Sequence, residues 1–173
     1  MRATPPVQPA KPAASRRDAS NLAKDMASTF TSLHYHIIFS TKERAPIIDH
    51  RWRSRLLEYL GGTVNGLGGF SECVGGIADH VHLLVGLKAT HCLSDFMREL
   101  KKASSLWVHG QIGMKGFAWQ EGYGAFTVSA ASRDKVREYI ANQEEHHRTK
   151  SFREELEEFL KRAGVKYEPK WLD

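Results

Sequence analysis

The 173-residue chain lacks the features of a membrane protein, a secreted protein or a zinc-knuckle protein. No apolar run approaches the roughly 18 residues that a membrane-spanning helix needs. No apolar signal segment stands near the N-terminus, which argues against secretion. The two cysteines, Cys73 and Cys92, make neither a disulfide framework nor a Cys-x-x-Cys pair. We therefore expect a cytoplasmic protein of a reducing compartment that makes no contact with a membrane.

The chain also lacks a phosphate-binding glycine loop. No Gly-x-x-x-x-Gly-Lys string occurs, and the glycine-rich stretch at 66–69 precedes a predicted strand, whereas a dinucleotide fingerprint follows one. We therefore expect no nucleotide cofactor.

Composition and charge predict one folded domain with a basic tail. Residues 1–25 hold four of the six prolines and no aromatic residue, so we expect a flexible tail there and a single domain over 26–173. The net charge of +5, from 25 Lys and Arg against 20 Asp and Glu, favours a polyanionic partner.

The spacing of apolar residues predicts an α+β fold. Strands are expected over 33–41, 70–77, 80–87, 117–120 and 124–130, and helices over 50–66, 92–109, 133–148 and 152–162. Ser132 is the expected N-cap of the third helix. The order β-α-β-β-α-β followed by C-terminal helices indicates a ferredoxin-like or RRM-like antiparallel sheet with helices on one face.

The string DHVHLLV at 79–85 is the most informative part of the sequence. Residues i and i+2 of a strand share a face, so His80 and His82 project side by side and can supply two nitrogen ligands to a divalent metal ion. Asp79 is placed to orient one of these histidines or to cap the turn. The alternative is two polar residues on a half-exposed strand.

A second His-x-His pair shows that this spacing alone does not define a metal site. His34 and His36 also share a face of their predicted strand. For this pair we expect structural hydrogen bonds or phosphate contact rather than metal ligation.

The predicted helix over 133–148 can complete a two-histidine site. Tyr139 and Gln143 are four residues apart and therefore share a helix face. Gln143 offers a carbonyl oxygen and Tyr139 a phenolic oxygen, and such an open site suits Mg²⁺ or Mn²⁺, although histidines also accept zinc. Alternatively, Tyr139 is a core aromatic residue, but its helix offers few apolar companions beyond Val136 and Ile140.

These motifs together resemble a known family. ADHVHLLV at 78–85 resembles the HUH motif, two histidines around a hydrophobic residue, of HUH endonucleases. With LHYHIIFSTKER at 33–44, WQEGYGAFTVS at 119–129 and VREYIANQ at 136–143, the chain is similar to single-tyrosine transposases of the insertion-sequence-200-like family. REP-associated tyrosine transposases are close cousins. The resemblance covers nearly all of residues 30–150.

The resemblance implies an HUH endonuclease architecture and a specific chemistry. His80, His82 and Gln143 would be the metal ligands, and Tyr139 would be the nucleophile. Family members cut single-stranded DNA at hairpin-bearing element ends, forming a 5′-phosphotyrosine and a free 3′-OH that later rejoins strands. They are typically homodimers in which the tyrosine helix of one subunit completes the site of the other.

Two groups of basic residues are candidate DNA contacts. One stripe of the helix over 92–109 carries Arg98, Lys101, Lys102 and Ser105, and a cluster after the first strand holds Lys42, Arg44, Arg51, Arg53 and Arg55. Either group can bind phosphates, and either can be an ordinary solvated face. Trp119 and Tyr123 are candidates for stacking on unpaired bases, although core packing is the simpler role for Trp119.

Two other functions compete with a transposase. A non-catalytic or domesticated single-stranded nucleic-acid-binding protein on the same fold would bind without cutting. A phosphoesterase of the His-x-His-x-His kind would need a third histidine where this chain has Leu84.

Overall fold

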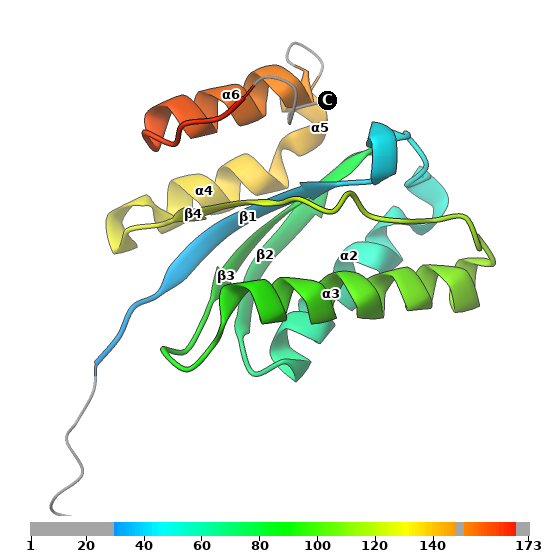
Figure 1. Cartoon of the computed structure of the whole chain (residues 1–173), viewed down its shortest axis with the longest axis horizontal. Helices are drawn as coiled ribbons and strands as arrows, with labels where there is room; N and C mark the ends of the chain where they lie inside the picture. Colours follow the sequence, from blue (N-terminus) through cyan, green and yellow to red (C-terminus); the bar gives the residue numbers. More distant parts are fainter. Residues whose placement is uncertain (1–29, 148–150, 169–173) are drawn as a thin grey trace, which may run out of the picture. The chain divides into compact units, whose positions relative to one another are not determined.

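The computed structural model describes residues 30–147 and 151–168, so the predicted tail over 1–25 lies outside the described residues. Its centre is a four-stranded antiparallel sheet with strand order β2-β3-β1-β4 (Figure 1). The strands are β1 (His34–Ser40), β2 (Phe70–Gly76), β3 (His80–Gly86) and β4 (Gly124–Thr127). The antiparallel sheet of the predicted α+β fold is confirmed.

Strand β3 lies inside the sheet, and its alternation divides the protein into two layers. Its apolar residues Val81, Leu83 and Val85 belong to one core. His80 and His82 point to the opposite face. In the antiparallel register with β1, His80 pairs with Ser40 and His82 pairs with Ile38. The polar side chains of the motif therefore share one face of the sheet.

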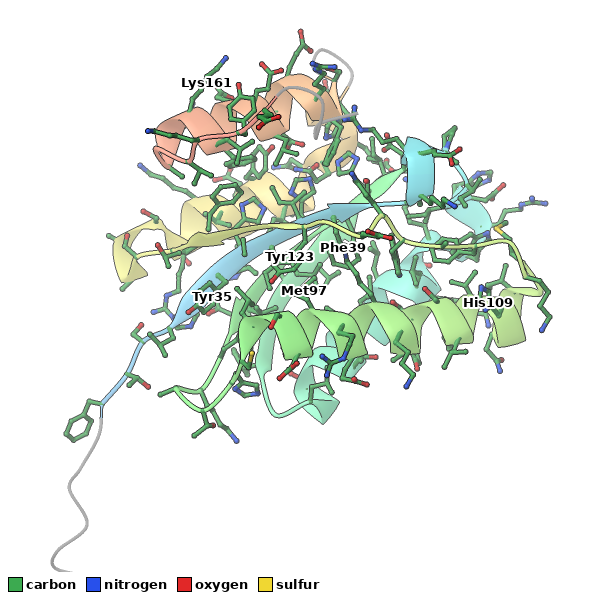
Figure 2. All side chains as sticks on the ribbon, in the orientation of Figure 1. Tyr35, Phe39, Met97, His109, Tyr123 and Lys161 are labelled. Atoms are coloured by element: carbon green, nitrogen blue, oxygen red, sulfur yellow. The ribbon has the colours of Figure 1, made fainter. Side chains whose placement is uncertain are left out.

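The first face is covered by α2 (His50–Gly66) and α3 (Leu93–Trp107). Their buried side chains recur at helical spacing and are Trp52, Leu56, Leu60 and Val64 on α2 and Phe96, Met97 and Leu100 on α3. Figure 2 labels Phe39 of the sheet and Met97 of α3, which both belong to this core. This half matches the predicted ferredoxin-like arrangement.

The second face carries the C-terminal helices. They are α4 (Arg133–Ala141), α5 (Gln143–His146) and α6 (Phe152–Arg162), drawn in yellow to red in Figure 1. Helices therefore cover both faces of the sheet, so the prediction of helices on one face alone is wrong. Across the described residues, no helix combines the length and the apolar character required to span a bilayer.

Three predicted boundaries are wrong in detail. The strand expected over 117–120 is one isolated bridge between Thr41 and Trp119. The helix expected over 133–148 is interrupted at Asn142, which separates α4 from α5. The strand expected over 124–130 ends at Thr127. Ser132 is the N-cap of α4, as expected, although its side chain makes no capping bond and its hydroxyl lies 2.9 Å from that of Ser129.

Helix α4 lies unusually close to strand β2. A Cβ atom added to Gly75 would collide with the carbonyl oxygen of Ile140 and would lie 2.8 Å from its Cγ2. Further along, Glu72 on β2 has a buried carboxylate that pairs with Arg137 at 2.7 Å and with Arg133 at 3.4 Å. A glycine contact and an ion-pair cluster thus fix α4 on the sheet.

We expect Gly75→Ala to destabilise the fold by about 1 to 3 kcal/mol, because α4 must move to make room for the methyl group. The matched control is Gly62→Ala in α2, where no atom lies within 4 Å of the added Cβ. The control should stabilise the protein by about 0.5 to 1 kcal/mol through helix propensity. Urea denaturation measures both changes, and equal stability of Gly75→Ala and wild type would contradict the close approach.

Candidate active site and metal centre

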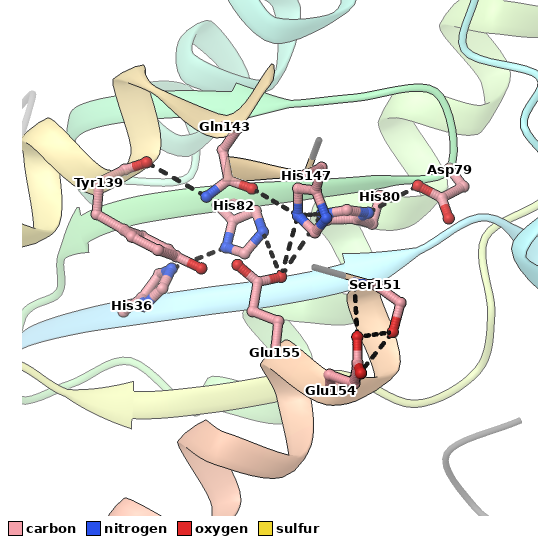
Figure 3. Close-up of polar contacts among 10 residues, drawn as sticks. All are labelled: His36, Asp79, His80, His82, Tyr139, Gln143, His147, Ser151, Glu154 and Glu155. Carbon is pink, nitrogen blue, oxygen red and sulfur yellow. Dashed lines mark hydrogen bonds and ion pairs between the residues drawn. The ribbon is translucent and has the colours of Figure 1, made fainter. Parts of the chain in front are cut away.

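The two histidines of the HUH motif begin β3 and are fully buried, with 0% exposure each. Each has a hydrogen-bond partner at Nδ1. His80 Nδ1 lies 2.7 Å from Asp79 Oδ1, and His82 Nδ1 lies 3.0 Å from His36 Nε2 (Figure 3). Both rings therefore present Nε2 to the interior of the second layer.

These partners select the tautomer that a metal ligand needs. A ligating histidine commonly donates its other ring N–H to a carboxylate or another acceptor. Asp79 provides such an acceptor for His80, as the sequence predicts. Burial lowers the pKa of His36 to about 4, so this ring is neutral near pH 7 and its Nε2 can accept the proton of His82.

Two further side chains converge on the same point. His147, just after α5, and Glu155, on α6, join His80 and His82 in a cluster whose ligand atoms all lie within 4.8 Å of one another. Glu155 Oε2 is 3.5 Å from His82 Nε2 and 3.3 Å from His147 Nε2, and His147 Nε2 is 3.0 Å from His80 Nε2. Burial, aided by the charges of Asp79 and Glu158, raises the pKa of Glu155 to about 8.

The cluster fits a metal ion. Ligands at 2.0 to 2.2 Å from a metal centre stand about 3.0 to 3.4 Å apart at neighbouring positions of an octahedron or a tetrahedron. Four of the separations between donor atoms, at 3.0 to 3.8 Å, fall close to this range, and the longest of these four joins Glu155 Oε2 to His80 Nε2. A cation would also offset the cost of burying the carboxylate among imidazoles. This part of the protein can hold a divalent metal.

Gln143 lies beside this cluster rather than within it. Its Oε1 is 3.1 Å from His147 Nε2, and its Nε2 donates to the carbonyl oxygen of Tyr139 at 3.3 Å. The side chain is buried, with 2% exposure. Gln143 therefore reaches the cluster through His147, and its role as the third metal ligand stays a prediction.

Tyr139 points from α4 toward the histidine face. Its ring centroid is 5.9 Å from that of His82 and 6.0 Å from that of His36, both with edge contacts. Phe159 of α6 closes the other side at 5.7 Å. The tyrosine is thus both packed among aromatic rings and adjacent to the candidate metal centre, which combines the two interpretations that the sequence leaves open.

Sequence reasoning missed His147 and Glu155, although both leave a signal. His147 continues the four-residue spacing of Tyr139 and Gln143. Glu155 falls between Phe152 and Phe159 on the apolar stripe of an otherwise charged helix, where a carboxylate is out of place.

The second His-x-His pair has structural hydrogen bonds, as expected. His36 contacts His82, whereas His34 Nε2 lies 2.9 Å from the buried carboxylate of Glu72. His34 thereby joins the ion-pair cluster around Glu72 that holds α4. It is not one of the residues of the candidate metal centre.

The candidate DNA-contact residues of α3 differ in availability. Lys101 turns inward, where its ammonium donates to the carbonyl oxygens of Gln120, Glu121 and Gly122 at 2.6 to 3.2 Å. Burial lowers the pKa of Lys101 to about 8. The stripe of basic side chains is therefore interrupted, because Lys101 binds the carbonyl groups of the loop before β4.

The remaining basic side chains of α3 border an open pocket. Lys102 is exposed, Arg98 is exposed and pairs with Asp95 at 2.6 Å, and Ser105 is half-buried. All three line a pocket of about 490 Å³. Its other walls include the two candidate stacking residues, Trp119 and Tyr123, of which Trp119 is buried and Tyr123 is 38% exposed.

The second candidate group follows β1. Lys42 is exposed, whereas Arg44 is half-buried and its guanidinium lies over the ring of Phe152, 5.2 Å from its centroid. Arg44 and its neighbour Glu43 both adopt left-handed backbone conformations, with φ of 49° and 55°.

Comparisons with known proteins connect this geometry to one family. The family model described as Transposase IS200 like matches residues 29–143. The transposase for insertion sequence element IS200 of Salmonella typhimurium is 31% identical over 129 residues, which cover 69% of this chain and 82% of that protein. The ISDra2 transposase TnpA of Deinococcus radiodurans is 30% identical over 119 residues, which cover 64% of this chain and 84% of that protein.

A solved structure agrees. The crystal structure of a transposase candidate from Deinococcus radiodurans superposes with a TM-score of 0.57 at 28% identity, over 68% of this chain and 95% of that chain. The fold and the site therefore define a DNA-processing transposase of the HUH type. The chain belongs to the IS200-like transposase family, which confirms the resemblance that the sequence motifs indicate.

We expect His82→Ala to weaken Mn²⁺ binding by roughly tenfold or more, because one of the buried nitrogen donors is lost. His34→Ala is the matched control, since His34 sits on Glu72 outside the cluster. Calorimetric titration with Mn²⁺ measures both affinities. Unchanged affinity in His82→Ala, or loss of affinity in His34→Ala, would contradict the assignment of the metal centre.

Proposed function

We propose that this transposase cleaves and rejoins single-stranded DNA at hairpin-bearing ends, with Tyr139 as the nucleophile. The observation that carries the proposal is the approach of the Tyr139 ring to His82, in the layer that holds the metal-binding cluster. Family membership supports DNA as the substrate. The resemblance of the motifs to single-tyrosine transposases supports the single-stranded substrate and the covalent step.

The chain's own residues divide the work of such a reaction. His80 and His82, with Gln143 beside them, would hold Mg²⁺ or Mn²⁺, and Asp79 and His36 keep the two rings in the ligating tautomer. When bound, the ion supplies charge that polarises the scissile phosphate and stabilises the leaving 3′-oxygen.

The covalent step needs no nucleotide cofactor. Attack of the Tyr139 oxygen on the phosphorus forms a 5′-phosphotyrosine and releases the 3′-OH. The phosphotyrosine keeps the energy of the broken phosphodiester, so a later 3′-OH can reverse the step without a nucleotide cofactor. A tyrosine with an ordinary pKa near 10 needs this activated phosphate to react at neutral pH.

We include a homodimer in the proposal, with each site completed by the tyrosine helix of the partner, as the resemblance implies. In the described chain Tyr139 contacts its own His82, and α4 is tied to its own β2 through Gly75 and Glu72. Exchange of the tyrosine helix between subunits therefore requires α4 to detach from its own β2.

Tyr139→Phe should abolish formation of a covalent protein–DNA adduct while leaving DNA binding intact, because only the hydroxyl is lost. The assay mixes protein, Mn²⁺ and single-stranded DNA from both flanks of its own gene, and detects an SDS-resistant band on a denaturing gel. Tyr59→Phe is the control, since Tyr59 stacks on Trp107 in the opposite layer.

An adduct in Tyr139→Phe would disprove this nucleophile. Binding without an adduct in the wild type would favour a non-catalytic DNA-binding protein instead. A mixture of Tyr139→Phe and His80→Ala proteins reports on the dimer, because adducts return only if one subunit's tyrosine serves the other subunit's histidines.

We further propose that α3 binds DNA phosphates through Arg98 and Lys102. Replacing both by alanine should weaken binding of the same DNA and reduce the salt dependence of the affinity by about 1.4 in log–log slope. The control double variant Lys161→Ala/Lys166→Ala removes equal charge from exposed positions of the C-terminal segment. Fluorescence anisotropy across a salt series measures the slopes, and identical slopes in both variants would reject α3 as the contact.

A further inference from the structure

The two HUH histidines cannot reach DNA in the described conformation. A metal ion that acts on a phosphate needs an open coordination position. Both His80 and His82 have 0% exposure, and Gln143 has 2%. Whatever covers these side chains must therefore be displaced before a phosphate can approach them.

Helix α6 supplies the cover. Its Phe152 ring lies 4.5 Å from the His80 ring, centroid to centroid, and its Phe159 ring lies 5.1 Å from that of His36. The helix starts at a complete capping box, in which the side chains and backbones of Ser151 and Glu154 bond reciprocally. Helix α6 is thus well formed, and its aromatic side chains pack against the rings of His80 and His36.

Glu155 is the part of α6 that enters the cluster. Its side chain is only 2% exposed, and its Oε2 lies 3.3 to 3.8 Å from the Nε2 atoms of His80, His82 and His147. A carboxylate resembles a phosphate in presenting anionic oxygens to a cation. The Glu155 oxygen would therefore compete with a phosphate oxygen for an ion held by these histidines.

Both extra donors lie beyond the part of the chain that the family model matches. That match ends at residue 143, whereas His147 and Glu155 follow it. The cover is thus a property of this chain's C-terminal segment rather than of the matched family core.

We propose that His147 and Glu155 complete a closed four-ligand metal site with His80 and His82, so that α6 must leave before DNA phosphate can bind. This inference rests on the proposed function for the identity of the excluded ligand. The closed site itself rests only on the described donors.

The donor set indicates which ion the closed site prefers. Three imidazole nitrogens and one carboxylate form a donor set typical of Zn²⁺. Mg²⁺ prefers oxygen ligands in octahedral geometry and usually retains several waters. The closed form therefore favours Zn²⁺, whereas the open form suits Mg²⁺ or Mn²⁺.

The test compares wild type with Glu155→Gln and with Glu157→Gln, all as full-length chains. Glu157 is the matched control, because it lies on the same helix, is 27% exposed and pairs with Arg153 and Lys161. Competition with a chromophoric chelator measures Zn²⁺ affinity, and hydrogen exchange measures protection of the α6 amides with and without Zn²⁺. Thermal unfolding in chelator confirms that each variant is folded.

We expect Glu155→Gln to bind Zn²⁺ roughly tenfold more weakly or worse, and Glu157→Gln to match wild type. Zn²⁺ should slow exchange of α6 amides in wild type and not in Glu155→Gln. Equal Zn²⁺ affinity in all three proteins would overturn the closed site. So would a rate of α6 amide exchange that is the same in wild type with and without Zn²⁺.

A second experiment, which measures formation of the covalent protein–DNA adduct, separates this inference from the proposed function. With Mn²⁺ and the flanking single-stranded DNA, Glu155→Gln should form more covalent adduct than wild type, since α6 is held less tightly. Less adduct in Glu155→Gln than in wild type counts against α6 as a barrier. If no protein forms an adduct while the Zn²⁺ results hold, the proposed function fails and the closed site stands.

Discussion

Burial of two imidazole rings on one strand is the constraint around which the second layer is organised. His80 and His82 lie on the face of β3 opposite a largely apolar core, and neither has access to water. Buried polar nitrogens must be hydrogen-bonded or bound to a cation. Asp79 and His36 satisfy one nitrogen of each ring, and the other two converge with His147 on Glu155. Helices α4, α5 and α6 provide the walls that this arrangement requires.

The two faces of the sheet thus serve different purposes. The face under α2 and α3 is a largely apolar core, in which the buried Ser104 of α3 accepts a hydrogen bond from Trp119. The opposite face has a small apolar cluster around Leu84 and Ile140 and is otherwise aromatic and titratable. Stability comes mainly from the first face, which allows the second to hold polar groups that would be costly in a single-core protein. Side chains of the second face can therefore be substituted while the apolar core on the first face continues to stabilise the sheet.

The sequence predicts those features that depend on local periodicity. Alternation on β3 correctly places His80 and His82 on one face, and the spacing of Tyr139 and Gln143 correctly brings both to it. Periodicity reports which side of an element is buried, not which element covers it. The docking of α6, and with it the role of Glu155, therefore escapes prediction. Lys101 shows the same limit, since its helical position suggests exposure while three carbonyl groups draw it inward.

The contact between Gly75 and Ile140 gives this protein a point of vulnerability at a residue that has no reactive side chain. Every other residue type carries a Cβ, and that atom collides with the backbone of the tyrosine helix. A copy of the gene that accumulates random changes can consequently lose its activity at a glycine with no chemical role. Among decayed copies, an intact Tyr139 is therefore no guarantee of a working enzyme, and the codon for Gly75 is an equally informative place to look.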